Sequence, residues 1–195
     1  MIRAFIALEL PDQARLDIAA VQNDLTSAGL KLRWVKPQNI HLTLKFLGDV
    51  DRAKITDICD SITSVACQHQ SFNLQPKGLG CFPGVKNPRV IWTGVSGTLD
   101  ALKTLQADVE KTLIPHGFKA ERRPFRGHLT IARVKSRLNP GKLAQALRNY
   151  SDFRSDIFAV KQVTLYQSLL EPEGPLYTRL CESPLGTPDK RLHQK

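Results

Sequence analysis

Hydrophobic positions in the first half of the chain change repeatedly between the spacing of a strand and the spacing of a helix. Alternating apolar residues over 3–9 predict a strand, and apolar residues recurring at helical spacing predict a helix over 11–29. A β-favouring segment follows at 40–47, and a second helical pattern covers 51–68. Pro and Gly residues between short apolar runs indicate a hairpin or loop over 72–95.

The second half continues in the same way. The pattern predicts a helix over 98–113, a strand over 125–134 and a short helix over 139–150. Two further strands are expected at 158–168 and 176–181. Strands and helices are mixed along the whole chain, which predicts an α+β protein.

One short pattern occurs twice. His41-Leu-Thr-Leu and His128-Leu-Thr-Ile are nearly identical, each lies inside a predicted strand, and each lies in its own half of the chain. Five His residues are present in 195 positions, so two such matches are not expected by chance. The repeat predicts two similar lobes, each carrying one copy.

Strand geometry tells how each copy is displayed. Side chains alternate across a strand, so His and Thr two residues apart share one face and the intervening Leu faces a core. If the lobes pack about a pseudo-twofold axis, His41 and His128 flank a shared cleft. Because an imidazole has a pKa near 6.5, one His can accept a proton while the other donates one, without a metal.

This arrangement suits phosphoester chemistry. The hydroxyls of Thr43 and Thr130 can donate to phosphate oxygens, and Arg133 is a candidate to balance the charge that develops there. A 2′,3′-cyclic phosphate needs this combination, with water attacking phosphorus and a proton delivered to the departing ribose oxygen. The remaining His69, His116 and His193 lack the pattern and are expected to be solvated structural residues.

The two motifs carry a family resemblance. His41-Leu-Thr-Leu-Lys-Phe-Leu-Gly48 and His128-Leu-Thr-Ile-Ala-Arg-Val134 resemble the signatures of the 2H phosphoesterase superfamily, in particular the RNA 2′,3′-cyclic phosphodiesterase branch, historically called 2′-5′ RNA ligase. Further similar segments are Ile2-Arg-Ala-Phe-Ile-Ala-Leu8, Trp34-Val-Lys-Pro-Gln-Asn39, Phe82-Pro83, Pro88-Arg-Val-Ile-Trp92, Leu165-Tyr-Gln-Ser168 and Gly174-Pro-Leu-Tyr177.

The resemblance implies a bilobal α+β fold, with two pseudo-symmetric lobes whose antiparallel sheets line a central cleft and whose helices lie outside. It implies hydrolysis of 2′,3′-cyclic phosphate RNA ends to a 2′-phosphate, with 2′-5′ RNA joining as the reverse reaction. By the same matching His41 is the proton donor, His128 is the proton acceptor, and Thr43 and Thr130 hold the phosphate. The residues alone do not tell which His is the acid and which the base.

The resemblance also implies that Phe46 and Arg133 contact the nucleotide or its phosphate. Each lies five residues after its His, so strict alternation turns it away from the cleft. Three interpretations remain open: the strand ends or bulges before these residues, their role is indirect, or they are a core Phe and a surface Arg.

The net charge of the chain indicates which kind of partner it binds. The chain has 28 Lys and Arg against 18 Asp and Glu, a net charge of +10, which favours anions such as RNA or nucleotides. We expect a basic cleft, because cations cluster around the two motifs. They are Lys31, Arg33, Lys36, Lys45, Arg122, Arg123, Arg126, Arg133 and Lys135.

Other function classes are disfavoured. Neither a K-x-D-G motif nor a P-loop is present, so nothing supports ATP-driven ligation. The four Cys show no metal-ligand spacing, and we expect reduced thiols, no metal and no cofactor. No apolar stretch is long enough to span a bilayer, and the start of the chain does not read as a secretory signal, so we expect a cytoplasmic protein.

The expected organisation is a single bilobal catalytic domain over 1–182, acting as a monomer, followed by a polar tail over 183–195. The alternative function is a nucleotide- or RNA-binding module that keeps the cleft without useful chemistry. The presence of both His and both Thr argues against it, because binding alone does not require an acid and a base.

Overall fold

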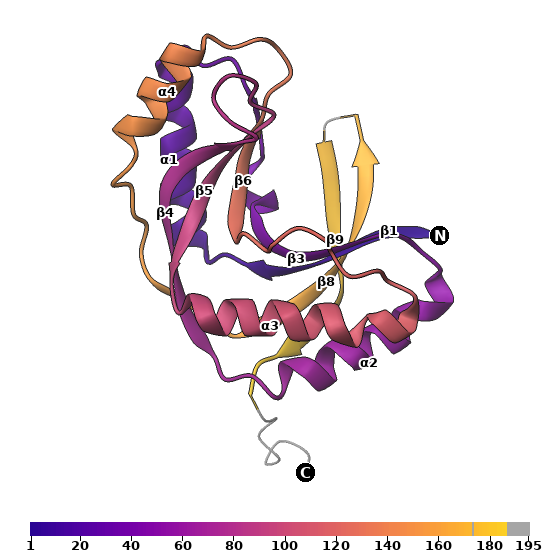
Figure 1. Cartoon of the computed structure of the whole chain (residues 1–195). Coiled ribbons are helices and arrows are strands. Elements are labelled where there is room, and N and C mark those ends of the chain that lie inside the picture. The colour runs from indigo at the N-terminus through magenta and orange to yellow at the C-terminus, as the bar shows by residue number, and fades with distance from the viewer. Residues whose placement is uncertain (173, 187–195) are drawn as a thin grey trace.

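The computed structural model describes residues 1–172 and 174–186, and their strands form one strongly curved antiparallel sheet (Figure 1). The strand order is β7-β4-β5-β6-β3-β1-β8-β9, and β2 pairs with β6. The sheet has two halves, which meet where β3 pairs with β6 and Leu42 lies opposite Leu129. The halves are the two lobes, named here after the His that each carries.

The His41 lobe is built from strands at both ends of the chain. Its strands are β1 (Ile2–Glu9), β3 (His41–Val50), β8 (Gln162–Glu171) and β9 (Gly174–Pro184). The helices α2 (Ile55–Ala66) and α3 (Leu99–Thr112) lie side by side on its outer face (Figure 1).

The His128 lobe has the same plan. Its strands are β2 (Arg33–Trp34), β4 (Phe72–Phe82), β5 (Val90–Gly97), β6 (His128–Arg133) and β7 (Phe158–Val160). The helices α1 (Asp12–Ser27) and α4 (Pro140–Asn149) cover its outer face (Figure 1). Short 3-10 turns occur at η1 (Pro37–Asn39), η2 (Arg52–Lys54) and η3 (Ile114–His116).

Burial follows the alternation of the strands. On β1, Ala4, Ile6 and Leu8 are buried in the main core, and Phe5 and Ala7 face the other way into a small aromatic cluster. Ile58 and Ile62 of α2 are completely buried against the same sheet. One face of each half-sheet therefore packs against helices, and the opposite face is left to line the space between the lobes.

These observations confirm the α+β fold with lobes, helices outside and antiparallel strands, and correct two details. The expected strand over 158–168 is two strands, because the chain leaves the sheet at the exposed Lys161; β7 pairs with β4 in one lobe and β8 with β1 in the other. The lobes are also not successive halves of the chain, since β8 and β9 complete the lobe that β1 begins.

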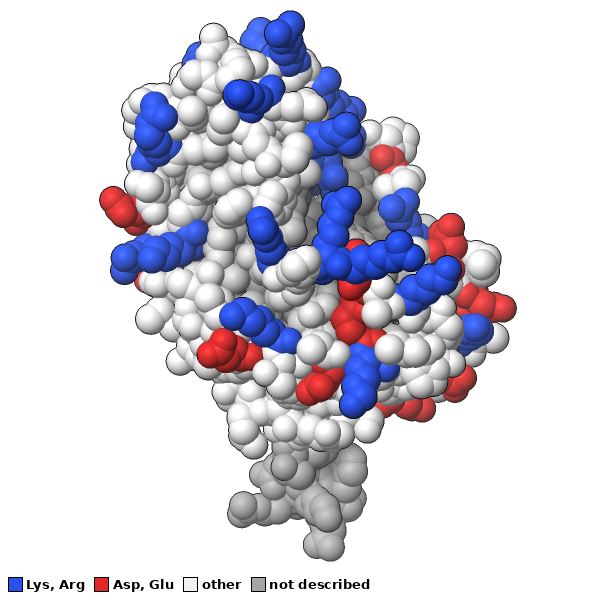
Figure 2. Space-filling view, in the orientation of Figure 1, with Lys and Arg blue, Asp and Glu red and all other residues white. Residues whose placement is uncertain are grey.

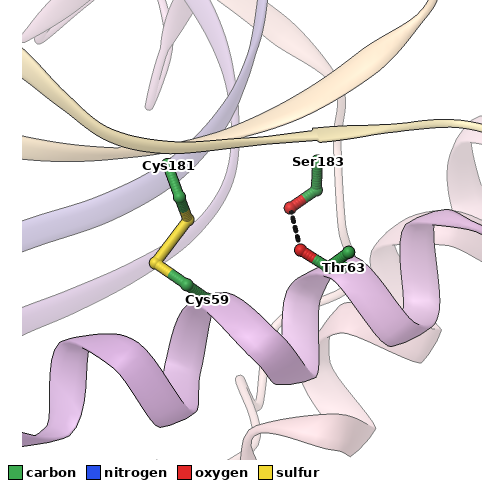
Figure 3. The surroundings of a disulfide bond; sticks show 4 residues. All are labelled: Cys59, Thr63, Cys181 and Ser183. Carbon is green, nitrogen blue, oxygen red and sulfur yellow. Dashed lines mark hydrogen bonds between the residues drawn. A yellow bond between two sulfur atoms is a disulfide. The ribbon is translucent and has the colours of Figure 1, made fainter. Parts of the chain in front are cut away.

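The expected start of the tail at residue 183 is wrong. Strand β9 continues to Pro184, and Ser183 is completely buried with its hydroxyl 2.8 Å from that of Thr63 on α2 (Figure 3). The backbone N–H of Leu185 still donates to the carbonyl of Lys161. The rest of the expected tail, residues 187–195 with His193, lies outside the described residues.

Two of the remaining His residues connect helices and are not simply solvated. His69 Nε2 lies 3.0 Å from Asp108 Oδ2 of α3, and His116 Nε2 lies 2.8 Å from the Ser61 hydroxyl of α2. His69 follows the end of α2 and contacts α3, and His116 lies in η3 after α3 and contacts α2, so the two contacts hold the ends of these helices together. None of the helices in the described residues is long and apolar enough to cross a membrane.

The expectation of four reduced thiols is also wrong, because Cys59 of α2 and Cys181 of β9 form a disulfide (Figure 3). Their Cα atoms are 6.2 Å apart although 122 residues separate them in sequence. Short-range Cys spacing cannot reveal such a pair, since only the return of β9 across α2 brings the residues together. Cys67 and Cys81 are free.

We predict that the disulfide stabilises the protein by closing this long loop. The double variant Cys59→Ala/Cys181→Ala should lose about 2–4 kcal/mol of unfolding free energy, because its unfolded chain regains conformational entropy. Urea unfolding with and without a reductant measures the effect. Cys67→Ala is the control and should match the wild type, whereas equal stability of oxidised and reduced wild-type protein would contradict the prediction.

Candidate active site

A cavity of about 580 Å³ lies between the lobes and brings the two motifs together. Its lining contains His41 and Thr43 from β3 and His128 and Thr130 from β6. Phe46 and Arg133 line the same cavity. The structure therefore places all the site residues expected from the sequence around one space, and their roles remain predictions.

The pairing of β3 with β6 sets this arrangement. Because Leu42 lies opposite Leu129 in an antiparallel pair, each neighbouring position pairs in reverse order. His41 thus lies across from Thr130, and Thr43 across from His128. Both Leu side chains are buried in the core, so the four polar side chains project together from the other face of the sheet.

A β-bulge in each strand explains how Phe46 and Arg133 reach the cavity. In the β1–β3 pairing Ala7 lies opposite Thr43 and Ile6 opposite Lys45, which leaves Leu44 as the extra residue. In the β5–β6 pairing Ile131 is left out in the same way. Each extra residue follows the motif Thr and reverses the alternation, so the residue five positions after His returns to the cleft face.

Buried glutamines from two helices bind the carbonyl groups of these bulges. Gln22 of α1 is 6% exposed, and its Nε2 donates to the carbonyls of Ile131 and Val35, both at 2.9 Å. Gln106 of α3 is 8% exposed and donates to the carbonyl of Leu44 at 3.4 Å, a weaker contact. Neither Gln belongs to the His-x-Thr repeat; a Gln among the apolar positions of a helix is the signal that the sequence offers for this role.

Both imidazoles are oriented by the same type of hydrogen bond. His41 Nδ1 lies 2.8 Å from the carbonyl oxygen of Asn39, and His128 Nδ1 lies 2.7 Å from that of Arg126. A carbonyl oxygen can only accept, so in each ring Nδ1 carries the hydrogen. Nε2 is therefore the atom that each ring has available for proton exchange.

Aromatic rings surround His41. Its ring stacks on Phe5 with centroids 4.6 Å apart and meets the edge of Tyr177 at 5.3 Å. This burial lowers the pKa of His41 from 6.5 to about 4; the hydrogen bond to Asn39 opposes the shift and the nearby His128 adds to it. With the cavity free of an anion, His41 is neutral at pH 7.

Tyr166 also packs against Phe5, beside His41, since the centroids of His41 and Tyr166 are 6.4 Å apart. The centroids of Tyr166 and Phe5 are 5.2 Å apart, and the Tyr166 hydroxyl donates to Glu9. Arg179 holds the same carboxylate through two contacts, at 2.7 and 2.8 Å. Phe5, on which His41 stacks, thus also contacts a tyrosine that belongs to a charged, hydrogen-bonded network.

The surroundings of His128 differ. The edge-on rings of Phe82 and Trp92 lie 5.1 and 6.4 Å from it, centroid to centroid. In the His41 lobe Phe5 of β1 lies opposite Phe46 of β3. In the His128 lobe the matching position is occupied by Val90 of β5, which lies opposite Arg133 of β6. The two His residues are related by the pseudo-twofold but lie in unequal environments.

Cations dominate the ionisable groups of the cavity. Arg3, Arg33, Lys36 and Arg133 line it, and Glu171 is the acidic residue among the described lining. Figure 2 shows Lys and Arg around the hollow of this face and over the lobe above it, whereas Asp and Glu gather over α2 and α3.

The expected basic cluster is therefore correct in part. Arg33, Lys36 and Arg133 line the cavity. Lys31, Arg122, Arg123, Arg126 and Lys135 are exposed outside it. The expectation that Lys45 belongs to the basic cleft is wrong, because the bulge turns its side chain to the helix side, where its Nζ lies 2.8 Å from Glu110 Oε2. Arg3 was missed, although strand alternation places it on the face of Phe5.

Comparison with known proteins identifies the family. The model of the LigT-like phosphoesterases matches twice, at residues 8–92 and 94–177, once on each copy of the motif. This chain belongs to the LigT-like phosphoesterase family. The double match agrees with the internal repeat of the His-x-Thr motif.

Members of the family resemble this chain over most of its length. A protein of Methanothermobacter thermautotrophicus named RNA 2′,3′-cyclic phosphodiesterase is 33% identical over 177 residues, covering 91% of this chain and 95% of that protein. A protein of Thermotoga maritima with the same name is 35% identical, covering 93% and 94%.

Solved structures of the family show the same fold. TT0787 of Thermus thermophilus matches with a TM-score of 0.77 at 25% identity, over 95% of this chain and 99% of that protein. The apo form of E. coli LigT matches with a TM-score of 0.75 at 25% identity, over 95% and 98%. Among the described residues of this chain, no group of three or more His, Cys, Asp or Glu could hold a metal ion.

We predict that Gln22 stabilises the bulge of β6. In Gln22→Leu the buried carbonyl of Ile131 and the part-buried carbonyl of Val35 both lose their side-chain donor, so the unfolding free energy should fall by about 1–3 kcal/mol. Chemical denaturation measures the change. Gln145→Leu, on the exposed side of α4, is the matched control; equal stability of both variants and the wild type would argue against the role given to Gln22.

We also predict that an anion in the cavity raises the pKa of His41. In the free protein its ring should titrate near pH 4, and inorganic phosphate should move the midpoint upward because a negative charge favours the imidazolium form. NMR titration of the His ring signals measures both midpoints, with His116 as the reference outside the cavity. An unchanged His41 midpoint at saturating phosphate would refute the prediction.

Proposed function

We propose that this protein is an RNA 2′,3′-cyclic phosphodiesterase that hydrolyses the cyclic phosphate at RNA ends to a 2′-phosphate. The observation that carries the proposal is the pair of imidazoles on one cavity, each with Nδ1–H bound to a backbone carbonyl and Nε2 available. The names of the relatives in Methanothermobacter and Thermotoga support the same reaction.

The reaction needs one proton acceptor and one proton donor. A water molecule attacks phosphorus while one Nε2 accepts its proton, the bond from phosphorus to the ribose 3′ oxygen breaks, and the other Nε2–H protonates that oxygen. Thr43 and Thr130 donate hydroxyl hydrogens to the phosphate oxygens, and Arg133 contacts the nucleotide or one of its phosphates. The product carries a 2′-phosphate and a free 3′-hydroxyl. When the 5′-hydroxyl of another RNA attacks phosphorus in place of water, the same bond to the 3′ oxygen breaks and the product is a 2′-5′ linkage.

In this proposal His41 is the proton donor and His128 the proton acceptor. The low pKa of His41 leaves it neutral in the free protein at pH 7, so it becomes a donor only when the cyclic phosphate is bound. The negative charge of the substrate then favours the imidazolium form in a cavity that excludes much of the solvent. Proton loading of His41 and substrate binding are thus coupled.

The two lobes form one catalytic unit in this proposal, since each contributes half of the site. The protein acts as a monomer, because the cavity is complete within one chain. Phe46 contacts the nucleotide. In this proposal the protein is located in the cytoplasm. The RNA substrate is the only ground for this location, because a protein with a disulfide does not support the argument from reduced thiols. No metal or cofactor takes part, so activity should survive EDTA.

The proposal predicts that His41→Ala and His128→Ala each lower kcat/KM by about 100- to 10,000-fold, because each removes one proton-transfer group. A dinucleotide ending in a 2′,3′-cyclic phosphate is the substrate, and the product isomer is identified by chromatography. His116→Ala is the matched control, since His116 contacts Ser61 away from the cavity, and it should retain wild-type activity.

Three results would change the conclusion. A 3′-phosphate product would overturn the regiochemistry, and near-normal rates in both His variants would overturn the mechanism. Tight binding of the dinucleotide without any product would favour the alternative, a nucleotide- or RNA-binding module of the same fold.

A further inference from the structure

More cations line the cavity than one reacting phosphate requires. The two motifs already supply two imidazoles and two hydroxyls around a single phosphate. Beyond them the lining contains Arg3, Arg33, Lys36 and Arg133, and none of these four pairs with a carboxylate of the described residues. A set of unpaired cations in one cavity indicates additional negative charge on the ligand.

Arg33 and Arg133 form the closest part of this set. They lie directly opposite each other in the pairing of β2 with β6, so their Cβ atoms are about 4.5–5.5 Å apart on one face of the sheet. Like charges placed opposite each other destabilise a strand pair. An anion bound between the two guanidinium groups removes that cost and gains charge-assisted hydrogen bonds.

This pair lies away from the reacting phosphate. Arg133 is three residues beyond Thr130 on β6, a distance of up to about 10 Å along the strand. The segment from Arg33 to His41 follows β6 in the opposite direction, since the N–H of Val35 donates to the carbonyl of Ile131 at 2.9 Å. Lys36 lies on this segment, between the arginine pair and His41. The cations thus flank one side of the cavity from the motifs toward β2.

We propose that Arg33, together with Lys36 and Arg133, forms a second phosphate subsite that binds the phosphodiester group immediately preceding the terminal nucleotide. The inference rests on the proposed function and names its substrate class: RNA ends of two or more nucleotides, in preference to cyclic mononucleotides. A cyclic mononucleotide has no phosphate at that position and leaves the arginine pair unsatisfied.

Three substrates separate the contributions. They are 2′,3′-cyclic AMP, the dinucleotide of adenosine with a 2′,3′-cyclic end, and the same dinucleotide with an uncharged methylphosphonate in its internal linkage. We expect the wild type to prefer the natural dinucleotide over both others by at least about tenfold in kcat/KM, because an internal charged contact is worth more than 1.4 kcal/mol. The methylphosphonate retains both bases, so it isolates the charge of the linkage.

The decisive variant is Arg33→Gln, with Arg148→Gln on the exposed side of α4 as the matched control. Arg33→Gln should reduce the preference for the natural dinucleotide to within about threefold, mainly through KM, and Arg33→Lys should retain part of it. The control should keep the wild-type ratio. In the wild type, log(kcat/KM) should fall with log salt more steeply for the natural dinucleotide than for the mononucleotide, by a slope of about 0.7, and Arg33→Gln should abolish the difference.

Binding measurements keep the test independent of catalysis. The product dinucleotide with a 2′-phosphate should bind the wild type at least about tenfold more tightly than 2′-AMP, and Arg33→Gln should remove most of this difference. Absence of turnover for all three substrates would refute the proposed function, while this comparison still decides the subsite.

The subsite is overturned if Arg33→Gln weakens all three substrates equally, or if the methylphosphonate is hydrolysed as fast as the natural dinucleotide. It is also overturned if Arg33→Gln weakens inhibition by ATP but leaves the dinucleotide preference unchanged. That result would assign the arginine pair to a nucleoside polyphosphate, whose adjacent phosphates offer similar charge from another source.

Discussion

Leu42 and Leu129 lie opposite each other where β3 pairs with β6, and the geometry of the candidate active site depends on this contact. The pair joins the two half-sheets and lies at the centre of their pseudo-twofold relation. Since both Leu side chains are buried, their polar neighbours must project from the other face. The antiparallel register then places each His beside the Thr of the other motif. Core packing and active-site geometry are thus two consequences of one strand pair.

The second constraint is the bulge that follows each motif Thr. Without the extra residues Leu44 and Ile131, the alternation of β3 and β6 would turn Phe46 and Arg133 toward the helices. The bulge has an equally important effect on Lys45, which becomes buried beside Glu110 rather than facing the cleft. Gln22 and Gln106 approach the bulges from opposite lobes, so the helices that cover the sheets also fix the shape of the site.

The backbone around the two His residues is nearly symmetric, but the side chains around them differ. The hydrogen bonds from Nδ1 of the two His to backbone carbonyls are nearly equal in length. Phe5 and Tyr177 nevertheless bury His41 and lower its pKa, whereas the equivalent position to Phe5 in the other lobe is Val90. A duplicated scaffold therefore displays two imidazoles on one cavity, and the unequal packing lowers the pKa of His41.

Much of the fold and of the candidate site follows from the sequence, because local patterns encode them. Alternation and helical spacing place most of the strands and helices, and the duplicated His-x-Thr pattern selects the four polar residues around the cavity. The disulfide between Cys59 and Cys181, the pairing of Arg33 with Arg133 and the capture of the bulge carbonyls by glutamines could not be predicted in this way. Each depends on residues far apart in the chain, and only the closure of the curved sheet brings them together. The sequence alone determined which chemical groups are present and on which strand face each motif displays them. The tertiary structure decided which distant groups meet and how deeply each is buried, because burial and long-range pairing are properties of the packed sheet and not of any single segment.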